Sequence, residues 1–319
     1  MICRGRIAIA SLFLALSATA AGAQSGRTIR LIVPAAPGAS TDFVARLSAD
    51  HITRVQGVTA VVENRPGANG MIGVEAVARS APDGNTLLVT ANTYLLDDLL
   101  RKPPYDPVAA FDPVCFLVQT PAVLVVNAES PYHTLRELLD AAKAKPGELS
   151  VAAVGPGSTL QLGLIALSRA AGVNLTYVPY NGSAPAVTAA LGGHVTAAIS
   201  GYSVVVEQIK AGKMRALATA TLKRIEPQPD LPTLDELGFK GMEIDNWFAV
   251  VAPAKTPQDK IAELSSWFSA AIAAPESKTK LAAQYLYTEK SCGADFGAMI
   301  NKTHDAYKQA IADANLKVP

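Results

Sequence analysis

The feature that most constrains the fold is a strand-to-helix corner at residues 31–42, with the sequence LIVPAAPGASTD. Its apolar start is typical of a buried strand, and two prolines and a glycine then break the pairing and turn the chain. Side-chain oxygens follow at Ser40, Thr41 and Asp42, three residue types that cap helix starts. The corner therefore predicts a strand that turns directly into a helix.

The start of such a helix can bind an anion. It presents unpaired backbone N–H groups and the positive end of the helix dipole. No lysine or arginine lies between Leu31 and Val44, so binding there would depend on backbone and hydroxyl donors. The corner predicts a carboxylate site, and the alternative is an ordinary capped helix in an α/β domain.

Short β-type runs alternate with helical patterns from Thr28 onward, which predicts a mainly parallel sheet covered by helices on both faces. Strands are expected at 29–33, 59–63, 86–90, 149–154, 175–178, 195–199 and 214–220. A doubly wound sheet places ligands at the carboxyl ends of its strands. Polar or glycine-rich loops follow several of these strands, at 91–94, 155–159, 180–183 and 200–203. The loop at 155–159 repeats the first corner in the second half of the chain.

Two apolar segments are expected to run between two halves of the molecule. The first is 114–127, which contains Pro121, and the second is the candidate return crossing at 247–251. Helical patterns dominate after Thr256. We expect two α/β lobes with two hinge crossings, and a helical tail that packs on the first lobe. Lobe 1 would comprise 27–119 plus 252–319, and lobe 2 would comprise 120–251.

The N-terminal residues read as a secretory signal peptide, 1–23. Arg4 and Arg6 precede the apolar run 7–21, and Ala21-Gly22-Ala23 is a small-residue cleavage site. No later apolar run is long enough to span a membrane. Cleavage would change the formal net charge from +1 to −1, because it removes two of 28 basic residues against 27 acidic ones. The chain is expected outside the cytoplasm, without a nucleic-acid partner.

Only Cys115 and Cys292 would remain after cleavage. An oxidising compartment permits them to pair, but two cysteines so far apart form no framework pattern. A disulfide and two buried free thiols both stay open.

Motifs for catalysis and cofactor binding are lacking. No GxSxG elbow surrounds any of Ser40, Ser158, Ser183 or Ser203, and the four histidines have no metal-ligand spacing. A third glycine is missing after Gly155-Pro156-Gly157, so the dinucleotide fingerprint is weak. We expect no cofactor, no metal and no enzymatic activity. The rivals are an exported serine hydrolase acting on carboxylic esters through Ser40 or Ser158, and a dinucleotide enzyme.

The mature chain resembles the Bug (TctC) family of periplasmic receptors for tripartite tricarboxylate transporters. The motifs that carry the resemblance are IRLIVPAAPGASTDFVARL at 29–47, VVENRPGANGMIG at 61–73, APDGNTLLV at 81–89, YDPVAAFDPV at 105–114, AKPGEL at 144–149, VPYNGSAPAVTAALGG at 178–193, AGKMRALA at 211–218 and LPTLDELG at 231–238.

The resemblance implies a class II periplasmic binding protein (a Venus flytrap) that closes on a carboxylated solute and delivers it to membrane permease subunits, as a monomer. It also implies that strand-to-helix loops of both lobes grip one carboxylate, partly through ordered waters. Asp42, an acid beside an anion site, is assigned to capping and water placement. The full set of expected ligand-binding residues is Gly38, Ala39, Ser40, Thr41, Asp42, Asn92, Gly157, Ser158, Thr159, Gln161, Tyr180, Ser183, Ala184 and Ser200.

The sequence departs from the family pattern at several site positions. Ala35 replaces the usual aromatic residue and Ala39 the usual second glycine, while Gln161 stands where a histidine is common. Asn181 replaces a common basic residue, and 199–201 lacks an acidic residue often used at the far end of the ligand. These departures favour a di- or tricarboxylate or an aromatic carboxylate over an amino acid.

Overall fold

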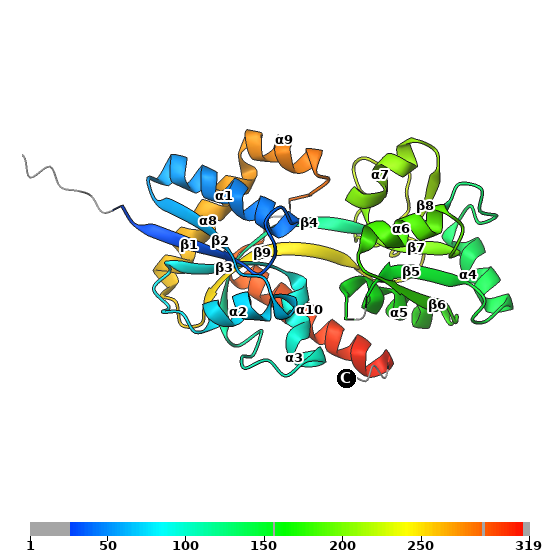
Figure 1. Ribbon diagram of the computed structural model, residues 1–319, viewed down its shortest axis with the longest axis horizontal. Coiled ribbons are helices and arrows are strands. Elements are labelled where there is room, and N and C mark those ends of the chain that lie inside the picture. Colours follow the sequence, from blue (N-terminus) through cyan, green and yellow to red (C-terminus); the bar gives the residue numbers. More distant parts are fainter. Residues whose placement is uncertain (1–25, 156, 289–290, 315–319) are drawn as a thin grey trace, which may run out of the picture.

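The computed structural model describes residues 26–155, 157–288 and 291–314 of the 319-residue chain. The predicted signal peptide lies outside these residues. Figure 1 shows an elongated molecule with an α/β lobe at each end and two long strands between them. The expected two-lobed α/β fold is confirmed. Within the described parts of the chain, none of the helices combines the length and apolarity that a membrane crossing requires.

The first lobe is built on three parallel strands in the order β2–β1–β3. These are β1 (Thr28–Val33), β2 (Thr59–Asn64) and β3 (Thr86–Ala91). The long strand β9 (Asp245–Pro253) pairs antiparallel with β3, and β4 (Phe111–Asn127) pairs antiparallel with β9. The helical elements are α1 (Ser40–Gln56), η1 (Ala68–Gly70), α2 (Met71–Ala78), η2 (Asn92–Leu96) and α3 (Asp97–Leu100).

The second lobe repeats this plan, with three parallel strands in the order β6–β5–β7. Both β7 and β8 pair antiparallel with β4. The strands are β5 (Ser150–Val154), β6 (Thr176–Tyr180), β7 (Ala197–Gly201) and β8 (Met214–Thr219). The helices are α4 (Leu135–Ala144), α5 (Thr159–Ala171), α6 (Ser183–Leu191) and α7 (Tyr202–Lys210).

The two crossings are β4 and β9. Residues 111–121 of β4 pair with β9, whereas residues 122–127 pair with β7 and β8. The sequence led us to expect lobe 1 at 27–119 plus 252–319 and lobe 2 at 120–251, and for the described residues we propose these bounds with one change. Because residues 248–251 of β9 already pair with β3, the second boundary moves back to residue 247.

The C-terminal helices are α8 (Gln258–Ala273), α9 (Pro275–Ala283) and α10 (Gly293–Ala314). Helix α8 packs on α1 and β4 of the first lobe. Helix α10 contacts β4 and η2 and also α5 of the second lobe, and Figure 1 shows it running from the first lobe toward the second. The helical tail therefore touches both lobes.

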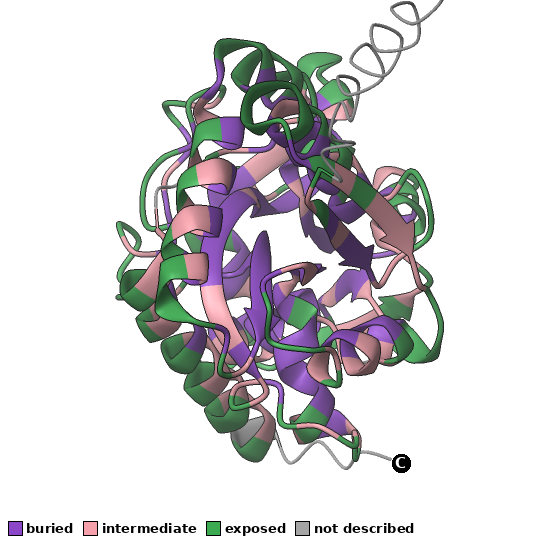
Figure 2. Cartoon of the chain, turned by 90° about the vertical axis from the view of Figure 1, so that its left-hand side faces the viewer, coloured by how far each residue is buried: buried purple, intermediate pink, exposed green. Residues whose placement is uncertain are grey.

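Each sheet is buried on both faces, as expected for parallel strands between helices. In β1, Leu31 and Val33 pack with α1 and α8, whereas the intervening Ile32 packs with α2 and α10 on the other face. In the second lobe, Leu124 of β4 packs with α4 and α5 on one face of the sheet, and its neighbour Val123 packs with α6 and α7 on the other. Figure 2 shows the buried strands at the centre and the exposed faces of the helices outside them.

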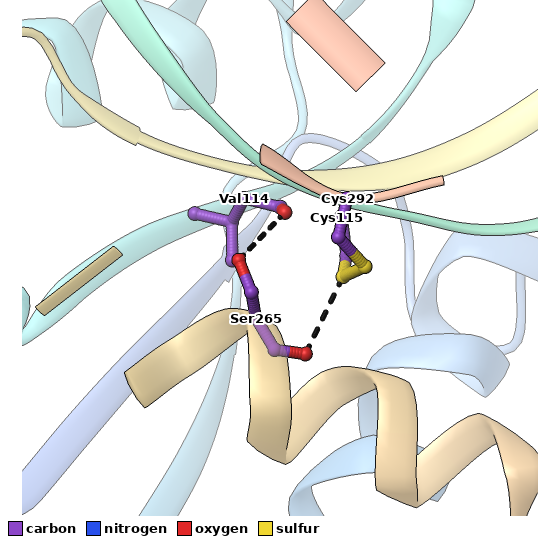
Figure 3. Close-up of a disulfide and its surroundings, with 4 residues drawn as sticks. All are labelled: Val114, Cys115, Ser265 and Cys292. Atoms are coloured by element: carbon purple, nitrogen blue, oxygen red, sulfur yellow. Dashed lines mark hydrogen bonds between the residues drawn. A yellow bond between two sulfur atoms is a disulfide. The ribbon is translucent and has the colours of Figure 1, made fainter. Parts of the chain in front are cut away.

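A disulfide joins Cys115 of β4 to Cys292, just before α10. Figure 3 shows it above α8, where Cys115 Sγ lies 3.5 Å from the Ser265 carbonyl oxygen and the Ser265 hydroxyl donates to the Val114 carbonyl. Of the two states that the sequence left open, the structure has the bonded one. The bond fixes the start of α10 to the first lobe.

Candidate ligand-binding site

A cavity of about 260 Å³ lies between the lobes and takes its walls from both. Ser40 lines it from the first lobe, and Ser158 and Ser183 line it from the second. The two corners that the sequence singled out, near residues 38 and 158, therefore face a shared space. The other lining residues are Thr93, Thr120, Ala122, Val154, Thr159, Leu160, Gly201, Ser203, Val204, Asn246 and Phe248.

Four helices begin at the wall of this cavity. Ser40, Thr159 and Ser183 are the first residues of α1, α5 and α6, and Ser203 is the second residue of α7. No side-chain hydrogen bond caps α1, α6 or α7. Their first backbone N–H groups have no partner within the helix. The cavity is thus surrounded by hydroxyls and by the positive ends of four helix dipoles.

The cavity is uncharged in its side chains. None of its described lining residues is a lysine, arginine, aspartate or glutamate. The local electrostatics therefore come from backbone dipoles, which favour an anion over a cation. Within the described residues, no group of histidine, cysteine, aspartate or glutamate side chains is arranged to hold a metal ion.

The corner of the first lobe is fixed by Asp42. Its carboxylate accepts hydrogen bonds from the Gly38 N–H at 2.9 Å, Arg46 Nε at 3.0 Å and Asn64 Nδ2 at 2.9 Å. Burial raises the pKa of Asp42, but these bonds outweigh burial and lower the pKa below its ordinary value of 3.8. Asp42 therefore holds the loop.

The predicted helix cap in this corner is wrong. Ala39 is the N-cap residue of α1, without a side-chain cap bond, because Asp42 reaches back to Gly38 and does not bond the N–H groups of the helix start. Gly38 and Asp42 line an adjacent surface cavity instead of the one between the lobes. Of the first-lobe corner, only Ser40 reaches the shared cavity.

The second lobe holds its corner in the same geometry. Gln161 Oε1 accepts a hydrogen bond from the Gly157 N–H at 2.8 Å, again four residues back. Ser158 caps α5, accepting from the Gln161 N–H at 3.1 Å while its hydroxyl donates to the Val154 carbonyl. The N–H groups of Gly38 and Gly157 are both occupied within their own loops, so neither is available to a ligand.

The structure places several expected site residues away from the cavity. Asn92 is fully buried, and its amide donates to the Asp245 carbonyl and to the Tyr307 hydroxyl. Ser200 is fully buried within β7. The expected site residues absent from the described cavity lining are Gly38, Ala39, Thr41, Asp42, Asn92, Gly157, Gln161, Tyr180, Ala184 and Ser200.

Four polar residues of the lining were not among the expected contacts. Thr93 and Ser203 lie in two of the loops that the sequence identified. Thr93 is one residue after the expected Asn92, and Ser203 is three residues after the expected Ser200. Thr120 and Asn246 lie on the crossing strands and are register partners. Thr120 is a polar residue inside the apolar crossing segment 114–127, whereas Asn246 lies just before the expected crossing at 247–251.

Two lobes, two crossing strands and a cavity lined from both lobes define a two-domain solute-binding receptor. The amino-acid sequence matches the family described as "Tripartite tricarboxylate transporter family receptor" (TctC) over residues 44–316, and the chain belongs to this family. The family and the fold are those of solute-binding proteins. The family assignment expected from the motifs is confirmed.

Known proteins are similar along most of the chain. BugT of Bordetella pertussis is 36% identical over 287 residues, which are 87% of each protein. A Rhodopseudomonas palustris protein solved with adipate is 30% identical, with a TM-score of 0.74, covering 91% of this chain and 97% of its own. MatC from Rhodopseudomonas palustris with bound malate is 28% identical, with a TM-score of 0.71, covering 89% and 99%.

Proposed function

We propose that this chain is a periplasmic receptor that captures a small organic carboxylate between its lobes and delivers it to a tripartite tricarboxylate-type membrane transporter. One observation carries the proposal: four helix N-termini open on one cavity whose described lining has no charged side chain. The similar proteins solved with adipate and malate hold carboxylates, which supports this class of ligand.

The energetics of such a site are adequate without a salt bridge. A hydrogen bond to a charged group contributes about 1.5–3 kcal/mol, and micromolar affinity corresponds to about 8 kcal/mol. Four or five such hydrogen bonds, with donors from both lobes, offset the cost of desolvating the carboxylate and still provide the binding free energy of micromolar affinity. Closure around the ligand would also exclude water and strengthen each bond.

We assign the residues of this site two roles. The direct donors are the hydroxyls and free N–H groups around Ser40, Thr159, Ser183 and Ser203, with ordered waters completing the shell. The positioning residues are Asp42 and Gln161, which fix the glycine of each corner. We propose no catalytic residue, metal or cofactor.

The cellular setting follows from the same proposal. The signal peptide at 1–23 would export the chain to the periplasm, where the Cys115–Cys292 disulfide is stable. The partner would be the permease subunits of a tripartite tricarboxylate transporter. The receptor would act as a monomer, since one chain supplies both walls of the cavity.

The hydrolase alternative has less support from the geometry. The Ser158 hydroxyl donates to a backbone carbonyl, and no histidine is among the described lining residues that could act as its general base. Turnover of p-nitrophenyl esters that is abolished by Ser158→Ala or Ser40→Ala would favour the hydrolase and contradict the receptor.

A thermal-shift screen tests the proposed function. The mature protein is mixed with mono-, di- and tricarboxylates, aromatic acids, sugars and cations. A ligand that binds only the folded state raises its stability by about 2.7 kcal/mol at 100 times its dissociation constant. We expect a higher melting temperature with at least one carboxylate. A response to sugars or cations alone would contradict the proposal.

A further inference from the structure

Helix α9 ends in a backbone conformation that usually requires a glycine. The Tyr285 N–H donates to the Ala282 carbonyl, and the N–H of the next residue donates to the Leu281 carbonyl, each at 2.9 Å. This pattern puts the residue after the C-cap in the left-handed region, and Tyr285 has a φ of +53°. A residue with a Cβ is strained there. The conformation persists because other contacts of Tyr285 offset the strain.

Those contacts are made with the other lobe. Tyr285 follows a helix of the first lobe, but its ring lies edge-on to the ring of Tyr202 in α7, with the centroids 5.6 Å apart and 81° between the planes. Its hydroxyl accepts a hydrogen bond from Lys210 Nζ at 2.8 Å and donates to Glu207 Oε1 at 3.2 Å. Tyr285 is thereby packed against the buried core of the second lobe.

The backbone that carries Tyr285 is fixed to the first lobe. The Tyr287 N–H donates to the Gln119 carbonyl at 2.9 Å, and the Gln119 N–H donates to the Tyr287 carbonyl at 2.8 Å. Leu286, between the two tyrosines, is buried in the core of the first lobe. Farther along, the disulfide ties the chain to the same strand, β4. Tyr285 therefore connects an anchored segment of the first lobe to α7 of the second.

The point of contact on α7 adjoins the cavity between the lobes. Tyr202 is the first residue of α7 and is only 1% exposed. Its neighbours Gly201, Ser203 and Val204 line the cavity. Among the described residues, no side chain caps this helix start, so packing holds it in place. The ring of Tyr285 is the contribution of the first lobe to the packing around Tyr202.

We infer that Tyr285 is a positioning residue of the ligand site: it joins the two lobes and holds the start of α7 at the cavity wall, without lining the described cavity itself. The inference rests on the proposed function, because α7 supplies donors to the carboxylate. The ring should matter more than the hydroxyl. Lys210 and Glu207 have exposed side chains, and exposed polar contacts contribute less than a buried edge-on aromatic pair.

Calorimetric titration of the mature protein tests this role, with whichever of malate, succinate, adipate and benzoate binds wild type most tightly. Tyr285→Gly should bind that acid about fivefold more weakly, as for the loss of one aromatic pair. Its urea midpoint should stay close to that of wild type, because glycine relieves the strained conformation and offsets the lost contacts. Tyr285→Phe keeps the ring and should bind within about twofold of wild type.

Lys255 offers a matched control. Its φ is +71°, and it is an exposed residue just beyond the end of β9. Lys255→Gly relieves a similar strain and should leave the affinity for the acid unchanged. Hydrogen exchange without ligand adds a second measurement: the amides of α7 at 206–210 should exchange about fivefold faster in Tyr285→Gly than in wild type, and no faster in Lys255→Gly.

The outcomes separate this inference from the proposed function. If Tyr285→Gly exchanges faster in α7 but binds the acid as tightly as wild type, the residue is only structural and the positioning role is wrong. Unchanged affinity and exchange in Tyr285→Gly, or an equal loss of affinity in Lys255→Gly, would also overturn it, while carboxylate binding stands. If none of the four acids binds wild type, both proposals fail.

Discussion

At the scale of single residues, Asp42 and Gln161 perform the same task in the two lobes. Each accepts a hydrogen bond from a glycine N–H four residues earlier. Asp42→Ala should lower the free energy of unfolding by about 1–3 kcal/mol, because it removes a buried carboxylate that accepts three hydrogen bonds, and should weaken ligand binding. Urea denaturation and calorimetry measure both. Asp42→Asn is the control, since its amide oxygen can replace the carboxylate at Gly38. An equal loss in both variants would contradict this role.

The charge of Asp42 also predicts a pH dependence. Folding lowers the pKa of Asp42 below 3.8, so its stabilisation is complete above the pKa of the unfolded chain and is lost as the pH falls through the lower folded-state pKa. Between about pH 5 and pH 3, wild type should lose more stability than Asp42→Asn. Parallel pH profiles of the two proteins in urea denaturation would show that the carboxylate charge plays no part.

The two corner glycines offer a matched pair. Gly38 and Gly157 have φ angles of +85° and +79°, so alanine at either position is strained by about 1 kcal/mol. Only at Gly157 would the new Cβ meet another lobe, 2.7 Å from Leu100 Cδ1 of α3. At Gly38 it meets nothing within 4 Å. We expect Gly157→Ala to weaken ligand binding more than Gly38→Ala, by calorimetry. Equal affinities of the two variants would mean that the contact between residue 157 and α3 has no effect on closure of the lobes.

At the scale of elements, the sequence predicted most strands and helices because their periodicity is strong. The strand expected at 29–33 is β1. A capping box, in which Thr134 and Glu137 make both of its hydrogen bonds, opens α4. The same Thr-x-x-Glu spacing occurs at Thr233 and Glu236 and forms both bonds, but the chain there makes turns and no helix. A capping box stabilises a helix start, and it cannot extend the helix without a periodic apolar face.

The candidate site was predicted less completely than the fold. Polar residues in the loops after the expected strands led to Ser40, Ser158, Thr159 and Ser183, which line the cavity. It could not tell that Asn92 turns into the core to bond Asp245 and Tyr307. The polar pair on β4 and β9 could not be predicted because the face of a strand residue depends on register, and register between segments over 100 residues apart is set by tertiary packing.

The disulfide connects two elements and should contribute to stability. It links β4 to the segment before α10, across 177 residues of sequence. Replacing both Cys115 and Cys292 by alanine should lower the free energy of unfolding by about 2–4 kcal/mol, measured by urea denaturation. The wild-type protein under reducing conditions should show the same loss. An unchanged midpoint in both experiments would show that the bond contributes nothing measurable.

At the scale of the whole molecule, a small apolar cluster joins the lobes. Leu96 and Leu100 of the first lobe contact Leu162 of α5, with Tyr307 and Ile311 of α10 packed against them. Burial of such side chains stabilises this arrangement of the two lobes. The balance between open and closed receptor should therefore depend on this cluster.

Two substitutions in α5 separate closure from stability. Leu162 is part of the interlobe cluster, whereas Leu164 belongs to the core of the second lobe itself. Each is at most 2% exposed, and alanine at either should cost about 2–5 kcal/mol of unfolding free energy. Only Leu162→Ala should also weaken ligand binding and enlarge the radius of gyration of the liganded protein in small-angle scattering. Equal binding losses in both would contradict a role in closure.

The account as a whole depends on recognition of negative charge by helix starts and hydroxyls. The most direct measurement is calorimetric titration of the mature wild-type protein with its best-binding acid and with the primary amide of that acid, which has nearly the same shape and no charge. We predict that the acid binds at least about a hundredfold more tightly, the equivalent of one or two hydrogen bonds to a charged group. Equal affinity for the acid and the amide would contradict the account.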